Sequence, residues 1–172
     1  MHRLHLLRHA KSGWDDDVED SRRPLAKRGR HAARLIGETL PGAIGALDLV
    51  LCSSALRTRE TAELVLAGFS PAAKVVYEDA LYLATAASLL ARLRKIPEAF
   101  GSAMVIGHNP GLHELATVLA LPRSKGARAL ADGKFPTGVR VSFAIEGRWD
   151  EIGDNRHSVI DYVTVKSLGG ED

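Results

Sequence analysis

The feature that most constrains the fold of this chain is a regular exchange between short apolar runs and longer segments with helical periodicity. Residues 3–7, 47–52 and 103–106 have the length and apolar character of strands that are covered on both faces. Helices are expected between them, beginning with residues 25–40, where the apolar side chains share one helix face. This alternation predicts an α/β fold, a three-layer sandwich with a mainly parallel central sheet and helices on both faces.

Local signals extend this pattern through the rest of the chain. Further helices are expected over residues 56–67, after an N-cap at Thr85, and after Asn109, which is suited to cap a helix whose first turn contains Pro110. Two later strands are expected over residues 139–143 and 159–165, and residues 123–138 read as an irregular basic loop.

Length and composition limit the class of protein. With 172 residues, no internal repeat and no linker, the chain is expected to form a single domain, residues 1–172. A net charge of +2 does not indicate nucleic-acid or membrane binding, and no apolar run reaches the ~18 residues of a membrane span. A single cysteine excludes an internal disulfide, so a cytoplasmic location is expected. The sequence leaves the oligomeric state open.

Basic side chains follow three of the predicted strands. Arg8 and His9 end the first, Arg57 follows the second after a short turn, and His108 follows the third. Because ligands of open α/β sheets bind beyond the carboxyl ends of the strands, these residues are expected to meet at one edge. Arginine forks and a helix N-terminus favour a phosphoryl group as the ligand.

These segments resemble the motifs of the histidine phosphatase superfamily, with its phosphoglycerate mutase-like fold. The resemblance covers residues 1–121 and rests on LRHAKS (7–12), SSALR (53–57) with ETA (60–62), and GHNPG (107–111). The short length and RRPLAKRG (22–29) are similar to the SixA-type branch, whose substrate class is phosphohistidine in proteins. The resemblance implies a phosphatase without metal or cofactor.

Carried over by position, the resemblance assigns one role to each of four residues. His9 is expected to be the nucleophile that accepts the phosphoryl group. Arg8, Arg57 and His108 are expected to bind the phosphate and to stabilise the charge of the transition state. The expected partner is a phosphorylated protein, with phosphohistidine as the reacting group, or a small phosphate ester.

The chain departs from the mutase-like branch in two places. It has Asp15 after Trp14, where that branch has an asparagine, and it lacks a carboxylate where that branch has its glutamate general acid. Glu78 and Asp79 are the nearest candidates for the acid. An imidazole leaving group depends less on such an acid, which favours a phosphohistidine-type substrate over an alkyl ester.

Other functional readings receive less support from the residues. A cysteine phosphatase needs an arginine at a fixed distance after its cysteine, and relative to Cys52 this chain has Thr58 at that position. His108 and His113 are not spaced for metal binding on one helix face. Arg59 and the acidic run 15–20 are expected to be solvated surface. The basic loop is expected either to be solvated or to bind an acidic partner, and its charged residues are Arg123, Lys125, Arg128 and Lys134. A small-molecule phosphomonoesterase and a noncatalytic phospholigand-binding module stay open as alternatives.

Overall fold

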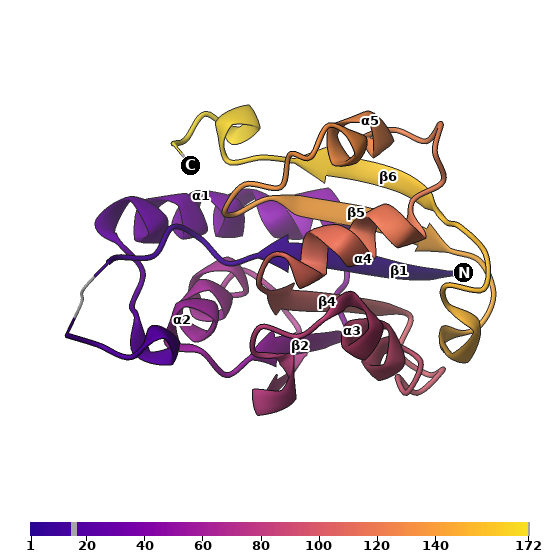
Figure 1. Ribbon diagram of the computed structural model, residues 1–172, viewed down its shortest axis with the longest axis horizontal. Helices are drawn as coiled ribbons and strands as arrows, with labels where there is room; N and C mark the ends of the chain where they lie inside the picture. The colour runs from indigo at the N-terminus through magenta and orange to yellow at the C-terminus, as the bar shows by residue number, and fades with distance from the viewer. Residues whose placement is uncertain (15–16, 172) are drawn as a thin grey trace.

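The computed structural model describes residues 1–14 and 17–171, which form one six-stranded sheet between two layers of helices (Figure 1). The strand order is β3-β2-β4-β1-β5-β6. The strands are β1 (His2–Arg8), β2 (Leu49–Ser53), β3 (Lys74–Glu78), β4 (Ser102–Gly107), β5 (Arg140–Ile145) and β6 (Ser158–Val163). The helices are α1 (Lys27–Ile44), α2 (Leu56–Val65), α3 (Ala86–Leu93), α4 (Gly111–Leu119) and α5 (Ala127–Ala131).

The sheet is mostly parallel, as the sequence predicts. Strand β4 pairs in parallel with β1 on one side and with β2 on the other, and β2 pairs in parallel with β3. Only β5 runs against its neighbours β1 and β6. The carboxyl ends of β1, β2 and β4 therefore lie side by side at one edge of the sheet.

Two apolar clusters cover the two faces of the sheet. The side chains of α1 and α2 pack on one face with Leu7, Val50 and Ile106, whereas α3, α4 and α5 pack on the other with Leu6 and Leu51. Alternate residues of β1 and β2 thus enter opposite clusters, because successive side chains of a strand point to opposite faces. This arrangement confirms the expected three-layer α/β sandwich.

Several element boundaries differ from the sequence expectation. Helix α1 begins at Lys27 rather than at Leu25, because Leu25 is buried in an isolated bridge with Ser12. Strand β3 was not predicted, since it is a sheet-edge strand whose side chains are largely exposed or half-buried. The loop expected over residues 123–138 contains the short helix α5. Only Ala127 and Leu130 of this helix are buried, and two residues are too few to show a helical period in the sequence.

The start of α4 also corrects the sequence reading. The helix begins at Gly111 with Pro110 at the N-cap position, and Asn109 makes no capping hydrogen bond. Its side-chain Nδ2 instead donates to the carbonyl oxygen of Phe135 at 3.0 Å. Asn109 therefore ties the start of α4 to the segment that precedes β5. Among the residues described, no helix has both the length and the apolar character needed to cross a membrane.

A close backbone approach explains one glycine of α1. A Cβ atom placed on Gly29 would lie 1.9 Å from the carbonyl oxygen of Lys11, far inside van der Waals contact. This contact presses the N-terminal turn of α1 against the segment that follows β1. Gly42 lies in the same helix, and a Cβ atom there would meet nothing within 4 Å.

The two glycines allow a matched test within one helix. Gly29→Ala should lower the free energy of unfolding by about 2–3 kcal/mol, because the new methyl group forces two backbone segments apart. Gly42→Ala should raise it by about 0.5–1 kcal/mol, because alanine restricts the unfolded chain and favours the helix. Urea unfolding of both variants measures the difference. Equal effects of the two substitutions would show that the Lys11 contact is not what requires glycine at residue 29.

Candidate active site

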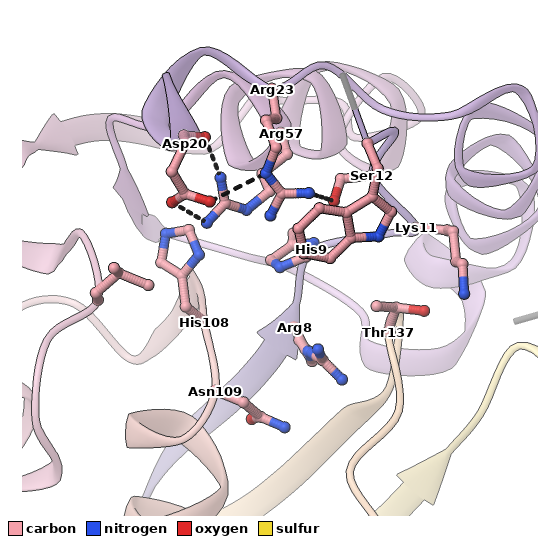
Figure 2. A pocket seen from close by; sticks show the side chains of 12 residues that line it. Arg8, His9, Lys11, Ser12, Asp20, Arg23, Arg57, His108, Asn109 and Thr137 are labelled. Atoms are coloured by element: carbon pink, nitrogen blue, oxygen red, sulfur yellow. Dashed lines mark hydrogen bonds and ion pairs between the residues drawn. The ribbon is translucent and has the colours of Figure 1, made fainter. Parts of the chain in front are cut away.

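The four residues singled out in the sequence line one pocket at the carboxyl edge of the sheet (Figure 2). Arg8 ends β1 and His9 follows it, Arg57 lies in the first turn of α2, and His108 lies between β4 and α4. The pocket has a volume of about 410 Å³. Its full lining is Arg8, His9, Lys11, Ser12, Trp14, Asp20, Arg23, Arg57, Leu83, His108, Asn109 and Thr137.

Hydrogen bonding determines which nitrogen of the His9 ring carries its proton. The Nδ1 atom lies 2.7 Å from the carbonyl oxygen of Ala10. Because a carbonyl oxygen only accepts, Nδ1 must be the donor, and the neutral ring then has its lone pair on Nε2. An imidazole with Nδ1 held and Nε2 unprotonated is suited to nucleophilic attack.

The backbone around His9 is held from three sides. The His9 amide donates to the carbonyl oxygen of Gly107 at 3.1 Å, and the His9 carbonyl accepts from the amide of Gly138 at 3.0 Å. The next amide, that of Ala10, donates to Oγ1 of Thr61 at 3.1 Å. Thr61 in turn donates to the carbonyl oxygen of Arg57 at 2.7 Å. The ETA segment noted in the sequence therefore links the backbone that orients His9 to the backbone that carries Arg57.

Burial and positive charge keep both histidines of the pocket neutral. Burial, assisted by the charges of Arg57, Arg8 and Arg23, lowers the pKa of His9 to about 4, against the opposing effect of its bond to Ala10. The pKa of His108 falls to about 3, mainly through burial. Both rings are thus uncharged at neutral pH, with one nitrogen of each ring free of a proton, and His9 requires this form to act as a nucleophile.

Three guanidinium groups surround the His9 ring. In Figure 2, Arg57 and Arg23 lie on one side of His9 and Arg8 on the other. Arg57 is only 3% exposed, and Arg8 donates through Nη1 to the carbonyl oxygen of Phe135 at 2.9 Å. This is a concentration of positive charge and N–H donors of the kind that binds phosphoryl oxygens.

Unpaired polar atoms also gather in this pocket. Within the described part of the chain, five buried side-chain nitrogen or oxygen atoms lack a hydrogen-bond partner, and four of them belong to pocket residues. These are Nε of Arg8, Nε of Arg57, Nδ1 of His108 and Oδ1 of Asn109. Since buried polar groups are otherwise paired in folded proteins, such a cluster is typical of a functional site.

Asp20 is a pocket residue that the sequence reading missed. Its carbonyl oxygen accepts from Nη1 of Arg57 at 2.7 Å, and its carboxylate accepts from Nη2 of Arg57 at 3.1 Å. The carboxylate also accepts from Nε of Arg23 at 3.0 Å and from the hydroxyl of Tyr82. The Tyr82 bond first, and then those from the two arginines, lower the pKa of Asp20 to about 2. At neutral pH Asp20 is therefore an ionised carboxylate that holds two arginines in place.

Arg23 is the second residue that the sequence reading passed over. Its Nη1 donates to Oγ of Ser12 at 2.8 Å, and its guanidinium lies 4.2 Å from the ring centroid of Trp14. The sequence contains one signal for both residues: Asp20 and Arg23 carry opposite charges at i, i+3 spacing, which favours an ion pair. This spacing is hard to recognise because Asp20 ends a longer acidic run. The part of that run at residues 15 and 16, including the departure at Asp15, lies outside the described residues.

The two sequence candidates for a general acid lie away from the pocket lining. Glu78 accepts from Nε of Arg92 through both carboxylate oxygens, at 2.9 and 3.0 Å. Asp79 is exposed and lines a different pocket. Among the described residues that line the pocket of His9, Asp20 is the only carboxylate.

The structure also shows the surroundings of the residues considered for a cysteine phosphatase or a metal site. Cys52 is buried, and burial raises the pKa of its thiol to about 12, so it is a core side chain rather than a thiolate. His113 stacks on Phe135 at a centroid distance of 5.3 Å and donates through Nε2 to the carbonyl oxygen of Leu130. In the described ranges, no group of three or more histidine, cysteine, aspartate or glutamate side chains lies close enough to hold a metal ion.

Comparison with known proteins identifies the family of the chain. Residues 4–82 match the histidine phosphatase superfamily (branch 1). The chain is 35% identical over 149 residues to uncharacterized protein Rv1276c of Mycobacterium tuberculosis, covering 85% of this chain and 91% of that protein.

Two solved structures of SixA proteins are similar over nearly their whole length. The one from Nakamurella multipartitia has a TM-score of 0.82 and 28% identity, with 95% of each chain covered. The one from Agrobacterium tumefaciens has a TM-score of 0.79 and 26% identity, covering 95% of this chain and 97% of that one. The chain therefore belongs to the histidine phosphatase superfamily, in its SixA-type branch, and is a phosphatase of the hydrolase class.

Proposed function

We propose that the protein removes a phosphoryl group through a covalent phosphohistidine intermediate on Nε2 of His9. The observation that carries this proposal is the bond from Nδ1 of His9 to the Ala10 carbonyl oxygen at 2.7 Å, which leaves Nε2 with the lone pair. A depressed pKa of about 4 keeps that lone pair available at neutral pH. Arg8, Arg57 and His108 line the same pocket and are the proposed phosphate ligands.

The reaction has two steps that balance without further reactants than water. In the first, Nε2 of His9 forms a bond to phosphorus while the bond to the leaving group breaks, and the leaving group takes the electron pair. In the second, the oxygen of a water molecule forms a bond to phosphorus and the water loses one proton to the solvent, while the Nε2–P bond breaks and its electron pair returns to His9. The arginines stabilise the phosphoryl oxygens in both transition states. Nε2 of His108 lies 2.7 Å from Oγ of Ser53. When the Ser53 hydroxyl donates to Nε2, the neutral His108 ring carries its proton on Nδ1, which is then a further donor for a phosphoryl oxygen.

Phosphohistidine in proteins is the substrate class that we propose. The only carboxylate among the described residues of the pocket lining, Asp20, is ionised and engaged with two arginines, so it is poorly suited to donate a proton. An imidazole leaving group has a pKa near neutrality and can take its proton from solvent, whereas an alkoxide needs a donor. The SixA proteins of similar structure are assigned as phosphohistidine phosphatases, which supports the same substrate. Faster turnover of a sugar phosphate than of a phosphohistidine protein would contradict this proposal and favour a small phosphate ester as the substrate.

The nucleophile is tested with an aryl phosphate in the presence of EDTA. His9→Ala should lower kcat by more than about 10³-fold, since removal of a nucleophile exceeds the ~10²–10³-fold loss of a single oxyanion contact. His31→Ala changes an exposed histidine of α1 and should retain full activity. Activity of the His9→Ala protein near that of the wild type would refute the central assignment.

The protonation state of His9 gives a prediction that needs no substrate. An NMR titration of the histidine Cε1 protons, assigned by comparison with His9→Ala, should place the His9 midpoint near pH 4. Burial and neighbouring positive charge both disfavour the imidazolium, so the folded ring binds its second proton only below the ordinary histidine pKa of 6.5. Arg57→Gln should raise the midpoint by removing one of those charges. A His9 midpoint at or above 6.5 would contradict this electrostatic account.

Asp20 is predicted to be a positioning residue rather than a proton donor. Asp20→Asn should lower kcat/KM by about ten- to a hundredfold, because Arg57 and Arg23 lose the carboxylate that orients them. The loss should be the same for 4-nitrophenyl phosphate and for phenyl phosphate, whose leaving group is much poorer. A loss several times larger for phenyl phosphate would identify Asp20 as the general acid.

A further inference from the structure

A second pocket lies next to the first and is built by the same loops. It has a volume of about 560 Å³ and is lined by Ser21, Arg22, Ser54, Leu56, Arg59, Asp79 and Tyr82. Ser21 and Arg22 follow Asp20 directly, and Leu56 precedes Arg57, so the linings of the two pockets alternate along the chain.

Tyr82 forms the boundary between the two pockets. Its hydroxyl donates to the Asp20 carboxylate, and its ring meets the His108 ring edge-on with a centroid distance of 5.4 Å. A group bound in the second pocket is therefore separated from the phosphoryl site by the thickness of one side chain. It would belong to the same substrate as the phosphoryl group or to a segment joined to it.

The second pocket carries two arginines whose terminal guanidinium nitrogens have no hydrogen-bond or ion-pair partner among the described residues. Arg22 is exposed, and its side chain has no hydrogen-bond or ion-pair partner among the described residues. Arg59 is exposed, its Nε donates to the carbonyl oxygen of Ser54 at 2.9 Å, and its guanidinium lies 4.4 Å from the Tyr77 ring centroid. These contacts orient the Arg59 stem and leave its terminal nitrogens for a ligand. Arg8, Arg23 and Arg57, in contrast, are all bonded through terminal nitrogens within the protein.

The chemistry of this lining favours an anionic ligand. The lining includes two guanidinium groups, two serine hydroxyls and one carboxylate, that of Asp79, so its formal charge is +1. Guanidinium forks bind carboxylates in a bidentate geometry. A partly exposed groove of this kind suits flexible acidic side chains on the surface of a larger molecule.

Exposed apolar side chains at the rim of the first pocket indicate a large substrate. Trp14 is 82% exposed and Leu83 is 52% exposed, although both line the pocket. Leu83 has a φ of +49°, the only positive φ of a non-glycine residue in the described part of the chain. Backbone in this sparsely populated region is found preferentially at functional sites. The two apolar side chains beside the pocket offer contact area to a substrate that extends beyond the phosphoryl group.

We propose that the second pocket is a specificity subsite in which Arg22 and Arg59 bind acidic side chains flanking the phosphohistidine of a protein substrate. The inference rests on the proposed function and deepens it. The same cations would bind a second phosphate if the substrate were a small doubly phosphorylated ester. The acidic protein segment is favoured because the exposed rim at Trp14 and Leu83 offers contact area that a small ester cannot use.

The test uses two peptides that each carry one phosphohistidine, prepared by chemical phosphorylation. One has two glutamates on each side of the phosphohistidine, and the other has glutamine at the same positions. At low ionic strength the wild type should prefer the glutamate peptide by roughly three- to tenfold in kcat/KM, the scale expected for exposed charge pairs. This preference should decrease in high salt.

The double variant Arg22→Gln with Arg59→Gln should reduce the preference to about one, while its turnover of an aryl phosphate stays at the wild-type level. The matched control, Arg123→Gln with Arg128→Gln, removes the same charge from the basic loop, which lines neither pocket, and should keep the preference. An unchanged preference in the Arg22 and Arg59 variant would overturn the inference, as would a loss confined to the basic-loop variant.

Two further outcomes separate this inference from the proposed function. Wild-type turnover of the aryl phosphate with no hydrolysis of either peptide would refute phosphohistidine as the substrate. A loss of activity in the Arg22 and Arg59 variant toward a small bisphosphate, with the peptide preference intact, would reassign the subsite to a second phosphate and overturn the protein-segment inference.

Discussion

Parallel pairing of β4 with both β1 and β2 is the constraint on which the rest of the site depends. It brings the carboxyl ends of three strands that are distant in sequence to one edge of the sheet. Each of these strands is followed at once by a residue of the pocket or by the helix that carries one. Because the strands are buried on both faces, their register and direction are firmly specified. The pocket residues that follow the strands are therefore held in fixed positions.

The pocket concentrates positive charge, and among the described residues of its lining one carboxylate, that of Asp20, offsets it. Arg8, Arg23 and Arg57 would repel one another and any protonated histidine, and Asp20 lies against two of them. Burial is the main cause of the neutral forms of His9 and His108, and the remaining positive charge of the arginines adds to it. The same electrostatics thus prepare the nucleophile and attract the phosphoryl group that it attacks.

The chain shows where a sequence reading succeeds. The motifs around His9, Arg57 and His108 follow short, largely apolar runs, whose length and alternation with helical segments favour buried parallel strands. The catalytic roles of these residues stay predictions, but their convergence in one pocket could be inferred from topology alone. Strand β3 and helix α5 could not, because the first is a half-exposed edge strand and the second is a single short turn with two buried residues.

By itself, the sequence determined the layer order, the parallel core of the sheet and the placement of four basic residues at strand ends, since these follow from local periodicity and chain order. Only the tertiary structure decided which other side chains join them. Asp20, Arg23 and Tyr82 come from loops with no periodicity, and their meeting depends on how those loops fold over the sheet edge. The tautomer of His9 was likewise a tertiary outcome, because it depends on the direction of one carbonyl group, that of Ala10.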